Sequence, residues 1–286
     1  MSEPVTVVTI VKGRHEHLRE QRRVLRAVAP RTPHVVVAMG DPAIDDVVGE
    51  DDLTTVVHVD VDPCGLPLAR ARNTGVSTAL AAGAELVVLL DVDCVPGPDL
   101  VESYRRAARL APGALLAGPV TYLPEGVEVP QDPRDLTALR APHPARPDPR
   151  PGSLERAGNH DLFWSLSCAV SASTWVTLGG FHEGYVGYGA EDTDLGRVAR
   201  SRGVELVWVG GADAFHQFHP VSHPPVEHLD DIVRNATTFH ARWGDWPMEG
   251  WLVEFERRGL LLRSAGRITA TADGQVSAGD GGSVHP

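Results

Sequence analysis

The first 90 residues alternate between two hydrophobic patterns. Continuous apolar runs rich in β-branched residues predict strands at 5–11, 35–39, 55–59 and 86–90. Apolar positions three or four residues apart predict helices over 16–29 and 68–82. This alternation of strand and helix indicates an α/β fold with a parallel sheet. Residues 87–90 are apolar on both faces, so we expect a central strand covered by helices, with the ligand beyond its carboxyl end.

The pattern becomes irregular after residue 122. Residues 123–160 are rich in proline and charge and lack a sustained period, which predicts a long surface excursion. Beyond it, strands are expected at 164–170 and 204–210, and helices over 191–201 and 226–244. Small, polar and glycine-rich residues then predict a flexible tail over 263–286. We therefore expect a single α/β domain over 1–262, with a proline-rich loop between its two halves.

Composition and charge narrow the classes of partner. The chain has 286 residues, 42% of them hydrophobic, which suits a soluble globular domain with a substantial core. Its 38 acidic and 26 basic residues give a net charge of -12, which argues against a nucleic acid or an anionic membrane as the main partner.

Cysteine spacing and the N-terminal sequence indicate the compartment. Cys64, Cys94 and Cys168 form no CxxC pair, so neither a disulfide framework nor a thiolate zinc site is expected. The opening "MSEPVTVVTIV" has no basic leader, and its apolar run is shorter than the ~20 residues that a membrane span needs. No transmembrane segment is expected, and we predict a cytoplasmic location.

Two aspartates follow the central strand directly. In an extended stretch Asp91 and Asp93 point the same way, so both carboxylates can face one ligand. Two carboxylates this close repel each other unless a cation lies beside them. Carboxylate oxygens are also ligands that Mg²⁺ and Mn²⁺ favour, usually together with substrate phosphates. An isolated DxD can also be an ordinary polar turn, so the surrounding sequence decides between the two interpretations.

Three blocks around this motif carry a family resemblance. The stretch "GLPLARARNTGVSTALAAGAELVVLLDVDCVP" resembles the metal-binding core of the GT-A glycosyltransferases, particularly family 2 and the β-1,4-galactosyltransferase group. "TIVKGRHEHLRE" is similar to the opening motif of the galactosyltransferases, although the Pro and Phe of that motif are not retained. "GGFHEGYVGYGAEDTDLGRVARSRG" is similar to a segment that follows DxD in the same enzymes. The three blocks occur in the family's order.

The resemblance implies a donor site in a nucleotide-binding half, residues 1–122. Asp93 would bind a divalent cation, Mn²⁺ or Mg²⁺, and Asp91 would contact the ribose or sugar. A histidine after the last strand would complete the metal shell, with His216 preferred and His219 as the alternative. The donor residues implied for the phosphates and the base are Lys12, Arg14, Arg70 and Asp41.

The third block implies the chemistry of the acceptor half, residues 161–262. An ionised carboxylate near the acceptor can take the proton of the incoming hydroxyl. The family pattern assigns this role to Asp192, with Glu191 or Asp194 holding the acceptor or supporting the loop. Tyr188 occupies a tryptophan position of the motif and could stack on an acceptor ring. The same carboxylates would also suit a helix N-terminus without any catalytic role.

The resemblance therefore implies a GT-A enzyme with a Rossmann-like, mostly parallel sheet flanked by helices. Its expected reaction is metal-dependent transfer of a sugar from a nucleotide-sugar, UDP-linked, to a hydroxyl of a glycan, lipid or small molecule, with inversion. Two alternatives are open: a retaining N-acetylgalactosaminyltransferase-like enzyme, and a non-catalytic sugar-binding module. A sugar-phosphate nucleotidyltransferase would want an N-terminal glycine-rich phosphate loop, which "TIVKGRHEHL" does not resemble.

Overall fold

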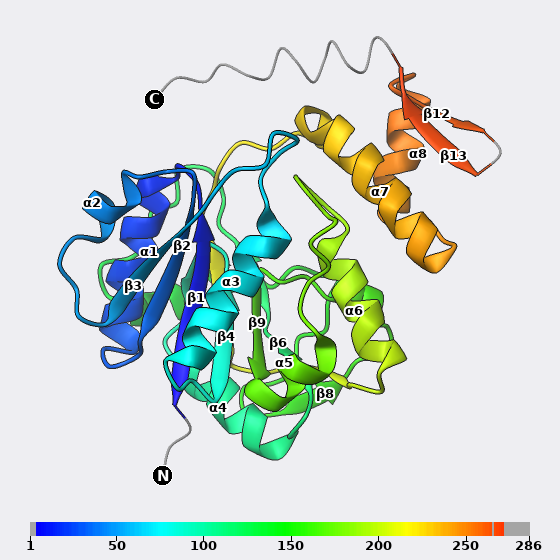
Figure 1. Cartoon of the computed structure of the whole chain (residues 1–286). Helices are drawn as coiled ribbons and strands as arrows, with labels where there is room; N and C mark the ends of the chain where they lie inside the picture. The colour runs from blue at the N-terminus through cyan, green and yellow to red at the C-terminus, as the bar shows by residue number, and fades with distance from the viewer. Residues whose placement is uncertain (1–3, 265, 272–286) are drawn as a thin grey trace.

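The central element is an eight-stranded sheet in a computed structural model that describes residues 4–264 and 266–271 (Figure 1). Its strands are β1 (Val5–Val11), β2 (His34–Met39), β3 (Thr54–Val59), β4 (Leu86–Leu90), β6 (Leu115–Ala117), β8 (Leu154–Arg156), β9 (Ser167–Ser171) and β10 (Leu206–Val209). Their order is β3-β2-β1-β4-β9-β6-β10-β8. The β1–β4 block is parallel, whereas β9 and β8 run antiparallel to their neighbours. The α/β class and the mostly parallel sheet expected from the sequence are confirmed.

Helices cover both faces of this sheet. In chain order they are α1 (His15–Val28), α2 (Ile44–Val48), α3 (Leu68–Ala81), α4 (Leu100–Leu110), α5 (Ala172–Leu178) and α6 (Glu191–Ser201). Residues of α3, α5 and α6 pack with Val87 and Leu89 on one face of β4. Residues of α1 and α4 pack with Val88 and Leu90 on the other. The run of β4 is therefore continuously apolar because both of its faces are buried, as the sequence indicated.

A second, three-stranded sheet stands beyond the end of β4 and positions one side of the site. It consists of β5 (Cys94–Pro96), β11 (Ala214–His216) and β7 (Val120–Tyr122), in the order β5-β11-β7. In its register His216 pairs with Cys94 on β5 and with Tyr122 on β7. A histidine from the last third of the chain is thus placed beside the residue that follows Asp93.

The proline-rich segment is more ordered than its sequence pattern predicts. It contains the 3-10 helix η1 (Pro133–Leu139) and supplies β8, the edge strand of the large sheet. Leu136 is fully buried, and Arg146 is 6% exposed. The prediction of a surface excursion without regular structure is therefore wrong for these parts, because contacts with distant strands replace a local period.

The C-terminal part forms its own layer beside the sheet. After η2 (His160–Leu162) and η3 (Val226–His228), it comprises α7 (Leu229–Trp243), α8 (Glu249–Arg257), β12 (Leu261–Ser264) and β13 (Arg267–Ala270). Figure 1 shows these elements at the end of the molecule toward which β1 and β4 run. The β12–β13 hairpin corrects the predicted start of the tail, because Leu261 and Ile268 are buried against α7 and α8. Residues 272–286 of that predicted tail lie outside the described residues.

Helix lengths and polarity bear on the membrane prediction. Within the described ranges, no helix combines the length and the apolar character that crossing a bilayer would require.

Candidate active site

The turn that carries Asp93 is fixed by buried hydrogen bonds. The N–H of Asp91 donates to the Leu166 carbonyl at 3.0 Å, and the N–H of Cys94 donates to the Asp91 carbonyl at 2.8 Å. The buried amide of Gln21, on α1, donates to the carbonyls of Asp91 and Cys94 at 2.7 and 2.8 Å. Gln21 therefore holds both ends of the turn between which the Asp93 side chain projects.

Asp93 lies beside two histidines that could bind a metal with it. The Nε2 atoms of His216 and His219 are each 3.5 Å from a carboxylate oxygen of Asp93. One ligand atom from each of the three residues lies within 4.8 Å of the others, a grouping that fits one small divalent cation. Burial lowers the pKa of His216, which favours the neutral imidazole that a metal requires. The sequence left His216 and His219 as alternatives, whereas the structure brings both to Asp93.

Ionisation of Asp93 is favoured despite its burial. Burial by itself opposes the charge, but the hydrogen bond with His219 and the neighbouring His216 and Arg14 outweigh it and lower the pKa of Asp93 to about 2. The Arg14 guanidinium is 3.5 Å from the carboxylate. A carboxylate and two imidazoles form a mixed oxygen and nitrogen donor set that suits Mn²⁺ among other divalent ions.

The loop after β1 is tied to the loop after β2. Asp41 accepts hydrogen bonds from the Gly13 N–H at 2.8 Å and from His15 Nε2 at 2.9 Å. Lys12 is exposed in the same loop, and Arg14 begins α1 with a left-handed backbone at φ 49°. Asp41 thus shapes the loop that presents the two predicted donor-binding cations.

A buried arginine joins the first aspartate of DxD to the third sequence block. Arg72, on α3, donates from Nη2 to Asp91 at 3.1 Å and from Nη1 to Glu191 at 3.1 Å. The Arg72 and Glu191 side chains are 5% and 8% exposed. Burial, reinforced by the neighbouring Asp192, raises the pKa of Glu191, and Arg72 opposes that rise. Glu191 therefore serves a buried ion pair at the start of α6.

Arg70, the arginine singled out in the sequence, lies elsewhere on α3. It donates to the Asp60 carbonyl after β3. Residues two apart on a helix point about 200° away from each other. Arg72 lies among the buried positions of α3, which include Ala69, Ala71 and Val76. A buried arginine needs a charged or polar partner, and this was the signal in the sequence that could have identified Arg72.

Asp192 is held by a single serine. Its Oδ2 accepts from the Ser165 N–H at 2.9 Å, and its Oδ1 accepts from Ser165 Oγ at 2.6 Å. Ser165 is completely buried and lies two residues before β9, the strand beside β4. Arg72 and Asp192 interact electrostatically, so Asp192 belongs to the same charged group as Asp91 and Glu191. Sequence reasoning found Asp192 but not the residue that orients it.

Asp194 makes internal contacts, which agree with the second of the two roles expected for it, support of the loop. The carboxylate is 1% exposed and accepts from Tyr185 Oη at 3.0 Å, Arg242 Nε at 2.7 Å and Trp243 Nε1 at 2.7 Å. These bonds connect α6 to the end of α7. With its oxygens satisfied inside the protein, Asp194 fixes the C-terminal layer instead of facing a ligand.

Tyr188 lies at the surface between two other rings. It is 39% exposed and stacks on His228 at 4.6 Å and on Trp251 at 5.9 Å between ring centroids. The preceding Gly187 has φ +74°, and a Cβ there would lie 2.2 Å from the Asp231 carboxylate. The glycine is required because α7 approaches the loop closely.

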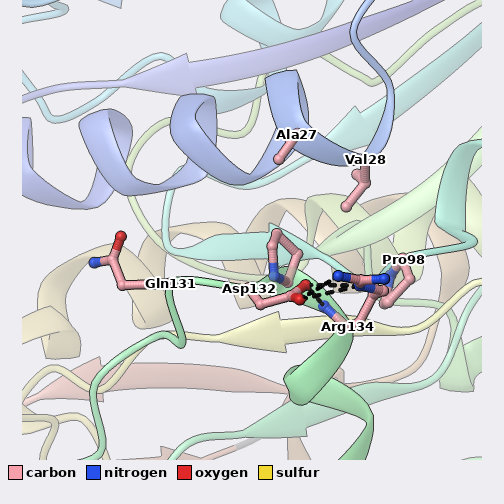
Figure 2. A pocket seen from close by; sticks show the side chains of 7 residues that line it. Ala27, Val28, Pro98, Gln131, Asp132 and Arg134 are labelled. Atoms are coloured by element: carbon pink, nitrogen blue, oxygen red, sulfur yellow. Dashed lines mark hydrogen bonds and ion pairs between the residues drawn. The ribbon is translucent and has the colours of Figure 1, made fainter.

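One surface hollow lies apart from these residues. Figure 2 shows it between the end of α1 and the segment 131–134, with Asp132 and Arg134 paired on one side. Its lining also includes Ala27, Val28 and Pro98. None of the cation-binding or acidic residues described above lines it, so it is not part of this site.

Comparison with known proteins supports the fold and the glycosyltransferase class. No family model matches the chain. It is 28% identical over 202 residues to validoxylamine A glucosyltransferase of Streptomyces hygroscopicus subsp. limoneus, covering 63% of the chain and 44% of the relative. The same enzyme of subsp. jinggangensis is 28% identical over 184 residues, covering 58% and 43%. The chain thus spans less than half the length of these curated relatives.

A solved structure supports the fold over nearly the whole chain. The chain superposes on GalNAc-T7, solved with UDP, GalNAc and Mn²⁺, with a TM-score of 0.56 at 13% identity, covering 97% of this chain and 54% of the other. These relatives and this neighbour are glycosyltransferases, which supports the expected transferase class. The narrower resemblance to the β-1,4-galactosyltransferase group stays a prediction. The chain has the GT-A type of α/β fold, with its acidic and histidine residues gathered beyond the carboxyl end of β4.

Proposed function

We propose that the protein is a metal-dependent glycosyltransferase that moves a sugar from a UDP-sugar to an acceptor hydroxyl with inversion. The observation that carries this proposal is the juxtaposition of two groups: Asp93, His216 and His219 as a cation site, and Asp192 held by Ser165. Asp91 interacts electrostatically with both Asp93 and Asp192, which links the two groups. The GalNAc-T7 structure, solved with UDP and Mn²⁺, and the weak similarity to a glucosyltransferase support it.

The donor half of the site is cationic where a diphosphate would lie. Asp93, His216 and His219 would hold a divalent cation, which would stabilise negative charge on the departing diphosphate. Arg14 stands 3.5 Å from Asp93 and can neutralise a phosphate oxygen next to that cation. Lys12, exposed in the same loop, adds a second mobile positive charge. Asp91, fixed by Arg72, is left to orient a sugar or ribose hydroxyl.

The acceptor half supplies a base. An acceptor hydroxyl becomes a better nucleophile when a carboxylate takes its proton, and Asp192 is the acidic residue of the site that Ser165 orients through both oxygens. The proton moves from the acceptor oxygen to Asp192 as the bond from that oxygen to the anomeric carbon forms. The bond to the UDP oxygen breaks at the same time on the opposite side, which gives inversion.

Two substitutions separate donor binding from turnover. Asp93→Ala should abolish the Mn²⁺-dependent thermal stabilisation by UDP, which for a ligand at 100 times its dissociation constant is about 2.7 kcal/mol. Asp192→Asn should keep that stabilisation but lower UDP release from UDP-sugars by about 10²–10⁴-fold. Asp132→Ala, an aspartate of the hollow outside the site, is the matched control and should behave as wild type.

The outcomes distinguish the candidate functions. A wild-type Mn²⁺ response in Asp93→Ala would remove the metal assignment. Binding of sugars without UDP release or transfer from any UDP-sugar would indicate a sugar-binding module. Transfer with retention of the anomeric configuration, observed by proton NMR of the product, would contradict the role of Asp192 as base.

A further inference from the structure

A row of aromatic rings extends from the cation-binding residues toward Asp192. Tyr122, on β7, lies 4.6 Å from the His216 ring between centroids. His143, in the proline-rich segment, stands edge-on to Tyr122 at 5.7 Å and to Trp164 at 5.4 Å. Tyr122 is 42% exposed, while His143 and Trp164 are partly exposed. We call Tyr122, His143 and Trp164 the aromatic wall.

The wall is supported from behind by a buried cation. The Arg146 guanidinium carbon lies 4.6 Å from the Trp164 ring centroid and 5.6 Å from that of Trp208. Among the described residues, none of its three guanidinium nitrogens has a hydrogen-bond partner, and none is in contact with solvent. A ligand cannot reach these nitrogens in this arrangement. The guanidinium contacts the rings of Trp164 and Trp208, so its role is to fix the Trp164 ring through cation–π attraction.

Trp164 is also next in the chain to the residue that holds the proposed base. It directly precedes Ser165, whose N–H and hydroxyl hold both oxygens of Asp192. A base must lie within hydrogen-bond distance of the proton that it removes. An acceptor whose hydroxyl meets Asp192 is therefore close to the residue that follows Trp164 in the chain, and its body lies near the wall.

We propose that the aromatic wall is the acceptor subsite and that the acceptor is an uncharged polyhydroxylated ring, a sugar or a cyclitol. This inference rests on the proposed function, because it takes Asp192 as the base. Aromatic faces bind the C–H face of such rings, while the hydroxyls at the rim stay free for hydrogen bonding. The carboxylate of Asp192, which takes its hydrogen bonds from the uncharged Ser165, adds negative charge beside the wall, and this disfavours an anionic acceptor. Arg146 is a positioning residue that acts through Trp164.

Binding and transfer measured on the full chain with Mn²⁺ and UDP-glucose or UDP test this proposal. The probes are myo-inositol and methyl β-D-glucopyranoside as rings, and N-acetylserinamide as an open-chain hydroxyl. With Mn²⁺ and UDP bound, saturation-transfer NMR should detect contact of the ring C–H protons of at least one ring probe with wild type. Trp164→Ala should weaken that binding by about tenfold, the scale of one lost aromatic contact, while UDP affinity is unchanged.

Conservative variants separate a platform from a merely structural tryptophan. Trp164→Phe should retain ring binding to within about threefold, since the apolar face remains. Arg146→Met should weaken ring binding, and Arg146→Lys should restore part of it because the charge returns. Trp246→Ala is the matched control, because Trp246 stacks on His240 in the C-terminal layer, away from the wall.

Each result supports or overturns the inference. Ring binding by Trp164→Ala equal to wild type, no contact of either ring probe with the loaded wild type, or a preference for N-acetylserinamide would overturn it. Failure of wild type to bind UDP with Mn²⁺ would instead refute the proposed function. In transfer assays, Trp164→Ala should raise the KM for the ring acceptor and leave the KM for UDP-glucose unchanged.

Discussion

The buried Arg72 ion pairs provide a stability test of the site's architecture. Arg72→Met removes the charge that joins Asp91 to Glu191 but keeps most of the aliphatic volume. Removing one partner of a buried ion pair costs about 3–5 kcal/mol, because the other charge is left without compensation. Most of that loss should come from Glu191, whose side chain is 8% exposed, since Asp91 at 21% can be solvated in part. We expect the variant to lose about 3–5 kcal/mol at pH 8.

The sign of the pH dependence follows from Glu191. Burial and Asp192 already raise its pKa in the folded protein above the ordinary value of 4.5, and loss of Arg72 raises it further. Between the pKa of Glu191 in the unfolded protein and its higher pKa in the folded protein, the folded state binds more protons than the unfolded state. The free energy of unfolding therefore falls as the pH rises through this range. The deficit of Arg72→Met should therefore shrink at pH 6, by about 1.4 kcal/mol for each further unit of pKa rise.

Urea unfolding of the metal-free protein at pH 8 and pH 6 measures both effects. Arg70→Met, two residues earlier on α3, is the matched control and should cost about 1 kcal/mol or less, since Arg70 bonds a carbonyl. Adding Glu191→Gln to Arg72→Met should recover part of the loss at pH 8 by removing the uncompensated charge. A loss in Arg72→Met no larger than in Arg70→Met, or a double variant less stable than the single one, would refute this reasoning.

Two further expectations concern Ser165 and His34. Ser165→Ala removes a 2.6 Å hydrogen bond to Asp192 and should lower the kcat of UDP release about tenfold, with an unchanged KM for the UDP-sugar. Ser165→Thr keeps the hydroxyl and is the control. A kcat of the Ala variant equal to that of wild type would show that the hydrogen bond is dispensable. Burial, together with Arg26 and Arg22, lowers the pKa of His34 to about 3, so the unfolded state binds the proton first and stability falls as pH drops below about 6.5. Between pH 6.5 and 5 this residue should account for about 1.5 kcal/mol of lost stability in urea unfolding, and His34→Asn should lack that share; an unchanged pH slope would contradict the assignment.

Local patterns in the sequence determined the elements whose cause lies within a few residues. Strands β1, β2 and β4 follow from continuous runs rich in β-branched and apolar residues, and α6 covers the predicted range 191–201. The motif blocks also placed Asp93 beyond the end of β4 and Asp192 at the start of α6. These features depend on the residue types at fixed, short spacings, which is what a sequence records directly.

The tertiary structure alone decided which distant side chains meet. Arg72 and Glu191 are 119 positions apart, and it is the rotation of α3 on the sheet that selects Arg72 over Arg70. Pairing of β11 with β5 and β7 sets His216 beside Asp93, and the loop that follows adds His219. No local period encodes such a register.

The same reason separates two carboxylates of one motif. Asp194 and Asp192 stand two positions apart in one acidic motif, yet one turns to Tyr185, Arg242 and Trp243 inside the protein and the other to Ser165. A carboxylate's role depends on how far packing buries it: Asp194 is 1% exposed, whereas Asp192 stays partly exposed. The sequence therefore determined the sheet and the chemical groups of the candidate site, whereas packing between distant segments decided which of these groups are buried in internal contacts and which stay exposed.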